Sequence, residues 1–413
     1  MAGSSPAMTQ RKDIMTKGLF AGLKVIDCAS FIAAPAAATV LSDFGADVIK
    51  IEPPGEGDLY RSLHTRPGSP KASRDYAWML DSRNKRGLAL DLKAPEGHEV
   101  LQRLVKTADI FITNMPLPVR RRLKTTYKDL APLNPRLIYA SFTAYGETGP
   151  EAEKTGFDST AYWARSGLMD LVRPDGEATP ARSTPGMGDH PSAMALYGAI
   201  MTALYRRERT GKGGQVASSL VANGLWSNSY LVQAKLIGSE FPPRPPRTHT
   251  INPLSNSYRC KDHRWFILSM VNEARQFAPF MEAIGLSDLI PRFHLQPERQ
   301  KHSPELIAIF DKVFAEKTLP EWRKILDDAG ITFGVVGTLD DIAGDEQARH
   351  AGAIVRVADG SAETVSSPFQ VDGETKRAPD AAPGIGQHTD EILREYGYTA
   401  ADITRLREAK AVA

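Results

Sequence analysis

The chain of 413 residues is long enough to form two domains that each bury a core. Its formal net charge of +2, with 24% charged residues, gives no indication of a polyelectrolyte partner such as nucleic acid. Two cysteines are too few for a disulfide framework and no apolar run approaches the roughly 18 residues of a membrane span, so we expect a cytoplasmic protein without a membrane partner.

The first half of the chain alternates strand-like and helix-like segments. Residues 1–19 are polar and have no apolar stretch, which predicts a disordered lead-in and not a secretory signal. Apolar and β-branched runs predict strands at 23–29, 46–52, 88–92, 110–113 and 136–142, and helices are expected at 34–44 and 95–108. This alternation predicts a mainly parallel sheet covered by helices.

Two places where a nucleotide-binding loop could lie do not have the required residues. The first strand-to-helix turn, SFIAAPAAAT, contains no glycine, whereas a dinucleotide pyrophosphate needs glycines for close approach of the backbone. The GKGG stretch at 211–214 follows a helix and is not followed by serine or threonine. It is therefore not a P-loop, and we expect it to cap the preceding helix.

The pair Gly188-Asp189 precedes the most distinct helical pattern. Apolar residues recur at helical spacing through 191–209, with arginines in the last turn and Gly211 just beyond it. Asp189 is therefore expected at the N-cap of this helix. It could serve only to satisfy free N–H groups. Alternatively, those N–H groups and the helix dipole keep its carboxylate ionised at pH 7, as a carboxylate nucleophile requires.

The second half of the chain is separated from the first by FPPRPPR at 241–247, where four prolines exclude a regular element. Beyond it, residues 258–270 predict a hairpin, and helices are expected near 273–284, 303–316 and 319–329. The tail contains a predicted strand at 353–357 and a helix at 389–396. The predicted organisation is a lead-in (1–19), a large domain (20–225), a linker (226–248), a small α+β domain (249–338) and a tail (339–413).

Several stretches resemble those of a single family. They are GLKVIDCASFIAAPAAATVLSDFGADVIKIEPPGEGD (22–58), SRNKRGLALDLK (82–93), ADIFITN (108–114), LNPRLIYASFTAYGETGP (133–150), the Gly188-Asp189 helix with its RRERTGKGGQV exit, and PGIGQHTDEIL (383–393). The family is that of the class III CoA-transferases (CaiB/BaiF type), which includes formyl-CoA transferase, carnitine CoA-transferase and the related α-methylacyl-CoA racemases. The resemblance implies that Asp189 is the catalytic nucleophile.

The resemblance also implies a fold. It is α/β, with a Rossmann-like large domain built on a mainly parallel sheet, a smaller α+β domain, and a tail that returns to the large domain. In the family, this path lets two subunits thread through one another as interlocked rings, so a homodimer is expected.

A CoA site is implied by the same resemblance. The matching positions are Ile32, Ala33, Leu90, Asp91, Leu92, Lys93, Asn114, Met115, Arg122 and Phe157. The CoA phosphates need Lys or Arg donors, and adenine needs an apolar slot. Leu90 and Leu92 could instead be strand core, and four basic residues could be either ligands or solvated surface charges: Lys85, Arg86, Arg120 and Arg121. The chain departs from formyl-CoA transferase at Ile32 and Pro53, where that enzyme has Gln and Arg, so some CoA contacts must differ.

The activity implied is acyl-CoA:carboxylate CoA transfer, with an acyl-CoA and a carboxylic acid as substrates. CoA is a substrate moiety, so neither a cofactor nor a metal is expected. The glycine-rich loop of formyl-CoA transferase has no counterpart in THTINPLSNSYRCKD (248–262), which favours an acyl group larger than that of oxalate.

Two alternatives remain open. A racemase on the same fold needs a second acid or base, and where the racemases have Gly-His-Asp this chain has Gly156-Phe157-Asp158. A noncatalytic subunit of a heteromeric transferase is disfavoured because Asp189 is retained. His190, beside the nucleophile, could orient a substrate or could be solvated or help to cap the helix.

Overall fold

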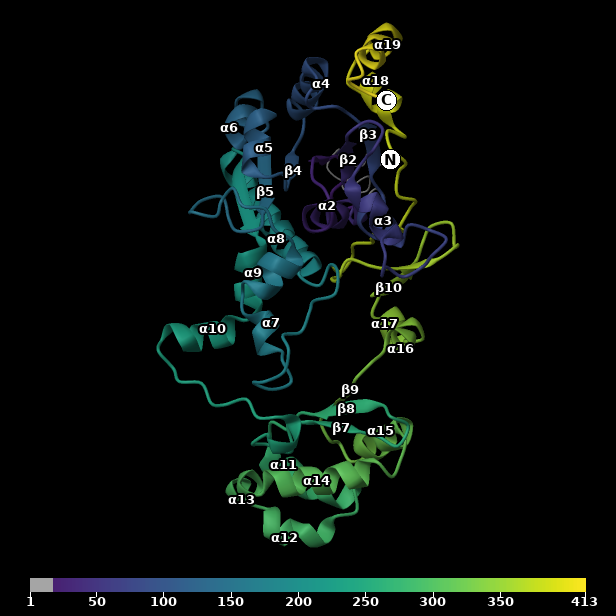
Figure 1. The fold of residues 1–413 in the computed structure, drawn as a ribbon. Helices are drawn as coiled ribbons and strands as arrows, with labels where there is room; N and C mark the ends of the chain where they lie inside the picture. Colours follow the sequence, from purple (N-terminus) through teal and green to yellow (C-terminus); the bar gives the residue numbers. More distant parts are fainter. Residues whose placement is uncertain (1–17) are drawn as a thin grey trace, which may run out of the picture. The chain divides into compact units, whose positions relative to one another are not determined.

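The computed structural model describes residues 18–413, so most of the predicted lead-in (1–19) lies outside the described residues. The chain forms two compact units (Figure 1). The first contains the residues up to Leu171, Arg182–Ala234 and Gln347–Ala413, and the second contains Val172–Ala181 and Lys235–Glu346. The second unit thus includes residues 172–181, which come from inside the range predicted for the large domain.

The first unit is built on a six-stranded sheet in the order β3-β2-β1-β4-β5-β6. Its strands are β1 (Lys24–Asp27), β2 (Asp47–Glu52), β3 (Arg86–Ala89), β4 (Ile110–Thr113), β5 (Ile138–Thr143) and β6 (Gly214–Ser219). Each neighbouring pair is parallel, which confirms the predicted α/β fold with a mainly parallel sheet. In β1, Val25 lies beside Val48 of β2 on one side and Ile110 of β4 on the other.

The edge strand β6 is not predicted from the sequence. Its residues, GQVASS, are mostly small and polar, so they have no run of β-branched side chains. Gly213 lies so close to β5 that an added Cβ would be 2.1 Å from the carbonyl oxygen of Leu137. The glycines of the GKGG stretch therefore also allow the edge strand to approach the sheet.

Helices cover both faces of this sheet. One core contains the alanine-rich α2 (Ala33–Asp43) and apolar residues of α8 (Asp189–Thr210). The other contains residues of α4 (Pro95–Val105), α18 (Thr389–Glu395) and α19 (Ala400–Glu408). Every residue of α2 is buried, because alanine side chains let this helix pack closely.

The remaining helical segments of the chain before the proline-rich linker are short. They are a 3₁₀ helix (Leu59–Thr65), α3 (Tyr76–Ser82), α5 (Leu117–Arg122), α6 (Tyr127–Leu130), a 3₁₀ turn (Ala131–Leu133), a π-helical segment (Asp158–Ala164), α7 (Leu168–Leu171), α9 (Leu220–Ser227) and α10 (Ser229–Leu236).

The start of α8 differs from the prediction. Gly188 occupies the N-cap position, and Asp189 is the first helical residue and forms no cap hydrogen bond, so the predicted N-cap role of Asp189 is wrong. An added Cβ on Gly188 would lie 2.5 Å from Cγ of Tyr162, so this close packing requires glycine before Asp189. At the other end, Gly211 adopts φ +71° and caps the helix, as predicted.

The tail contributes to the first unit. It contains α17 (Glu346–His350), the antiparallel hairpin β10 (Ile354–Arg356) and β11 (Glu363–Val365), and then α18 and α19. Val412 pairs with Leu90, and the amide of Ala89 donates to Oγ1 of Thr389 at 3.2 Å, so the end of the chain lies beside β3 (Figure 1).

The second unit has its own antiparallel sheet and core. The predicted hairpin is formed by β7 (Ser257–Arg259) and β8 (Trp265–Leu268), and β9 (Phe333–Val335) pairs with β8. Helices α11 (Glu273–Ala283), α14 (Ser303–Phe314) and α15 (Leu319–Asp328) confirm three predicted helices and bury their apolar faces together. Shorter segments complete the unit: Arg247–His249, Ser287–Leu289, α12 (Ile290–Phe293), α13 (Gln296–Lys301) and α16 (Leu339–Ala343). Among residues 18–413, no helix is long and apolar enough to cross a membrane.

Candidate active site

The strand order brings several predicted site residues to one place. β1 connects to β2 on one side of it and has β4 on the other, and in such sheets ligands bind outside the carboxyl ends of the strands at this switch point. Asn114, directly after β4, accepts a hydrogen bond from the amide of Ser30 at 2.8 Å and donates to its carbonyl at 2.6 Å. Asn114 therefore joins the segments that follow β1 and β4.

The segment after β1 is held in an uncommon conformation. Phe31 has φ 62°, a left-handed backbone conformation that is rare for a bulky residue and is one of the strained conformations found at functional sites. Ile32 and Ala33 follow it and are buried at the start of α2. Four of the ten predicted CoA positions, namely Ile32, Ala33, Asn114 and Met115, thus lie after the two adjacent strands β1 and β4.

Four other predicted CoA positions, Leu90–Lys93, lie farther along the same edge. β2 separates β3 from β1, so Leu90–Lys93 follow a strand that is not at the switch point. Leu90 and Leu92 are buried in the core, and the amide of Asp91 donates to the carbonyl of Ala411 at 2.8 Å. Lys93 is exposed.

The basic residues near this edge divide into engaged and available groups. Lys85 is buried, and its Nζ donates to Oδ2 of Asp27 at 2.8 Å. Arg120 is buried against Glu147, and Arg86 and Arg121 also form ion pairs. Arg122, at the end of α5, is exposed and forms no ion pair with any residue of the described range 18–413. Of these five cations, Arg122 is the one with its charge available to a phosphate.

Asp189 is half-buried at the start of α8, near a second carboxylate. Burial, followed by the charge of Asp158, raises the pKa of Asp189 to about 7, and the positive charge of His190 partly opposes this rise. The prediction that the helix start keeps this carboxylate ionised at pH 7 is therefore wrong as stated: desolvation and a like charge outweigh the helix N-terminus. With a pKa near 7, this carboxylate changes its charge close to neutral pH.

The turn before Asp189 is held from two sides. Gly186 has φ +80°, and its amide donates to Oδ2 of Asp158 at 2.9 Å. Its carbonyl lies 3.2 Å from Nδ1 of His190, and Nε2 of that ring lies 3.1 Å from Oδ1 of Asp81. Tyr60 donates to Oδ2 of Asp81 at 2.6 Å. His190 is therefore held by contacts of both of its ring nitrogens and is not simply solvated.

Sequence reasoning missed Tyr60 and Asp81. One signal was available for Asp81, because helical spacing places it four residues after Ala77, on a face that is buried in α3. A carboxylate on a buried helical face needs partners, and this points to a site. No comparable signal marks Tyr60.

Phe157 lies at the edge of this site with 58% of its surface exposed. Its ring packs edge-to-face against that of Phe31, with the ring centroids 5.8 Å apart. It directly precedes Asp158, the acid that holds Gly186. An aromatic pair, with Phe157 exposed and Phe31 partly buried, therefore lies next to the turn that carries Asp189.

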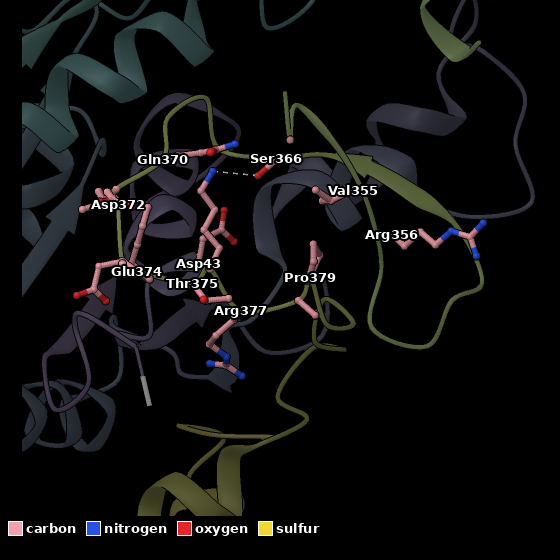
Figure 2. Close-up of a pocket in the computed structure, with 16 residues that line it drawn as sticks. Asp43, Val355, Arg356, Ser366, Gln370, Asp372, Glu374, Thr375, Arg377 and Pro379 are labelled. Carbon is pink, nitrogen blue, oxygen red and sulfur yellow. Dashed lines mark hydrogen bonds between the residues drawn. The ribbon is translucent and has the colours of Figure 1, made fainter. Parts of the chain in front are cut away.

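A cavity of about 740 Å³ lies elsewhere in the first unit. Figure 2 shows that Asp43 lines it together with tail residues such as Val355, Ser366 and Pro379. Nζ of Lys376, another lining residue, donates to Oγ of Ser366 at 3.1 Å. None of the predicted site residues contributes to its lining. Within residues 18–413, no group of three His, Cys, Asp or Glu side chains is arranged to hold a metal ion.

Comparison with known proteins adds to this geometry. Residues 20–389 match the family described as CoA-transferase family III. The chain is 33% identical to (R)-2-hydroxy-4-methylpentanoate CoA-transferase of Clostridioides difficile, covering 95% of this chain and 99% of that protein. It is 32% identical to cinnamoyl-CoA:phenyllactate CoA-transferase of Clostridium sporogenes, with 95% and 97% covered. The crystal structure of a CAIB/BAIF family protein from Brucella suis superposes with a TM-score of 0.81 at 26% identity, covering 92% of this chain and 100% of that one.

Proposed function

The chain belongs to CoA-transferase family III, and on that basis we propose that it moves CoA from an acyl-CoA to a free carboxylic acid with Asp189 as the nucleophile. The observation that carries the proposal is the half-buried Asp189 carboxylate, whose pKa is raised to about 7. A raised pKa makes the ionised form more basic than an ordinary aspartate, and it still leaves a large fraction ionised at neutral pH.

The reaction proceeds by four exchanges of bonds at carbonyl carbons. The Asp189 carboxylate attacks the thioester carbon of the acyl-CoA, the C–S bond breaks, and an aspartyl anhydride and the CoA thiolate form. The thiolate attacks the aspartyl carbonyl and expels the donor acid as its carboxylate, which leaves an aspartyl-CoA thioester. The acceptor carboxylate then attacks this thioester, releases the thiolate and forms a second anhydride. Attack of the thiolate on the acceptor carbonyl gives the new acyl-CoA and restores Asp189.

No oxidation occurs and no net proton is taken up in this sequence. CoA enters and leaves as part of a substrate, so the proposal includes no cofactor. Each attack places negative charge on a carbonyl oxygen, which backbone N–H donors stabilise. The amides of Gly188 and Asp189 are the donors we propose, because neither forms a backbone hydrogen bond within the described chain outside its own helix.

The acyl group is proposed to be apolar and larger than oxalate. The two relatives named above act on 2-hydroxy acids with branched or aromatic side chains. The Phe31–Phe157 pair beside the nucleophile gives such a side chain an apolar surface to contact. The charge of His190 lowers the pKa of Asp189, and His190 is already paired with Asp81.

A homodimer is proposed as the working form, with interlocked rings as in the resembling family. Exposed aromatic residues on α9 and α10 support an interface, since Trp226 is 79% and Tyr230 is 85% exposed. Replacing Trp226 with Glu is expected to shift the mass measured by light scattering from dimer towards monomer. We also propose a cytoplasmic location, because the two cysteines, Cys28 and Cys260, are both unpaired.

The experiment that tests the proposal is exchange of CoA between an acyl-CoA panel and free acids. Acyl-CoA donors with branched, aromatic and dicarboxylate acyl groups are each incubated with unlabelled acids, and new acyl-CoA is measured by mass spectrometry. Transfer is expected for apolar 2-hydroxy acids and is expected to be abolished in Asp189→Ala. Exchange that persists in Asp189→Ala overturns the proposed nucleophile.

A further inference from the structure

A continuous chain of hydrogen bonds connects four segments around Asp189. It runs from the Tyr60 hydroxyl to Oδ2 of Asp81 (2.6 Å), and from Oδ1 of Asp81 to Nε2 of His190 (3.1 Å). It continues from Nδ1 of His190 to the carbonyl of Gly186 (3.2 Å), and from the amide of Gly186 to Asp158 (2.9 Å). The segments are the 3₁₀ helix Leu59–Thr65, α3, the turn before α8 and the π-helical segment Asp158–Ala164.

The hydrogen-bond acceptors around His190 define the protonation state of its ring. The Gly186 carbonyl can only accept a hydrogen bond, and the Asp81 carboxylate, which already accepts from Tyr60, also accepts. Both ring nitrogens of His190 therefore face acceptors, which is the arrangement of a doubly protonated ring. Hydrogen bonding to Asp81 and its charge overcome the effect of burial and raise the pKa of His190.

The charges that face this ring come from every neighbouring segment. Asp81 contacts Nε2 of the ring and itself accepts from Tyr60, and the charge of Asp189 also acts on the ring. Asp158 acts on Asp189 in turn. Lys85 donates from its Nζ to the backbone carbonyl of Asp81 at 2.7 Å and so adds a second, buried cation behind this carboxylate. His190 acts more strongly on Asp189 than Asp81 does, so the pair as a whole favours the ionised nucleophile.

We propose that Tyr60, Asp81 and His190 form a positioning network that holds a protonated imidazole beside Asp189 and fixes the Gly186 turn from which the nucleophile projects. This inference rests on the proposed function of Asp189. Asp81 acts through His190, and Tyr60 acts through Asp81, so both are positioning residues. The network also gives the buried Asp81 carboxylate of α3 two hydrogen-bond partners, Tyr60 and His190.

The test is the pH dependence of kcat/KM for CoA transfer in single variants. His190→Gln removes the positive charge and leaves Asp81 ionised. Asp81→Asn removes the partner that keeps the imidazole protonated. Both variants therefore weaken the positive charge beside Asp189, and both are expected to move the acid limb of the kcat/KM profile to higher pH. A shift of about one unit lowers the rate about tenfold near pH 6 and leaves it almost unchanged near pH 9. The shift is expected to be larger for His190→Gln, because that variant retains the opposing charge of Asp81.

Two further variants complete the test. Tyr60→Phe removes one hydroxyl donor and is expected to shift the limb in the same direction by a smaller amount, without changing the buried charge. His64→Gln is the matched control, because His64 forms a similar ion pair with Asp75 at 3.3 Å, and neither residue acts on Asp189. Its profile is expected to match that of the unmodified protein.

The outcomes separate the network from the nucleophile. An equal loss of rate at every pH in Asp81→Asn and His190→Gln would show a merely structural role and overturn the network. An unchanged profile in all three variants would also overturn it, and Asp189 would stand as the nucleophile. Transfer that persists in Asp189→Ala would instead remove the proposed function, whatever the profiles of the other variants.

Discussion

Replacing Asp189 with Asn is expected to abolish CoA transfer and to stabilise the folded protein at alkaline pH. In the folded state, burial and Asp158 raise the pKa of Asp189 from 3.8 to about 7. Because the folded-state pKa is above the unfolded one, ionisation of this group opposes folding. The stability that its neutral form supplies is present below about pH 4 and is lost as the pH rises through about 7. Asparagine cannot ionise, so the Asp189→Asn variant does not lose this part of its stability as the pH rises from about 4 to about 7.

The size of the effect follows from the shift. About three units correspond to at most about 4 kcal/mol. Because the side chain is only half-buried, solvent screening reduces the expected gain to about 1–2 kcal/mol. Urea unfolding at about pH 4 and about pH 8.5 measures it, with the midpoint read at constant m-value. The two proteins should be equally stable at the acid pH, and the variant should be more stable at the alkaline one. A variant that is less stable at alkaline pH, or an equal difference at both pH values, would refute the reasoning.

Three further outcomes are expected. Arg122→Ala should raise KM for acyl-CoA more than it lowers kcat in steady-state assays, because a phosphate contact is made in ground and transition states alike. Arg121→Ala is the control: Arg121 is paired with Glu153 on the surface, so its loss should leave KM unchanged. A 2-methylacyl-CoA incubated in D2O should show no enzyme-dependent deuterium at C2 by NMR, since the position of the racemase histidine carries no titratable group; rapid uptake would favour an isomerase. Lys85→Met should lower the unfolding free energy by about 3–5 kcal/mol, because it leaves Asp27 buried without its closest cation, whereas Lys324→Met at an exposed pair should change it by less than about 0.5 kcal/mol in urea melts.

The parts of the fold that sequence patterns predicted are those with strong local signals. The five strands predicted in the first half of the chain are apolar runs, and all five appear in the parallel sheet. The long helix ends at Gly211 because only glycine adopts that φ readily. β6 has no such signal: it is held by pairing along β5, which is a tertiary contact, and not by its own side chains. Its identification required the sheet itself.

The site divides in the same way. Motif resemblance predicted Asp189 and the positions after β1 and β4 as site residues, because these lie in continuous stretches of sequence. The network through Tyr60 and Asp81 joins residues more than a hundred positions away from His190, so only the folded chain brings them together. The two errors at Asp189 also have tertiary causes, since packing on Tyr162 sets where α8 begins and Asp158 with burial sets the charge.

Trapping of the covalent intermediate tests the central claim most directly. The protein is incubated with an acyl-CoA, hydroxylamine is added, and the peptides are analysed by mass spectrometry, with Asp189→Asn as the control. An aspartyl anhydride or aspartyl-CoA thioester reacts with hydroxylamine to give a hydroxamate, so we expect this modification on Asp189, dependent on acyl-CoA and absent in the variant. A hydroxamate on another residue, or none while CoA transfer proceeds, would contradict the account.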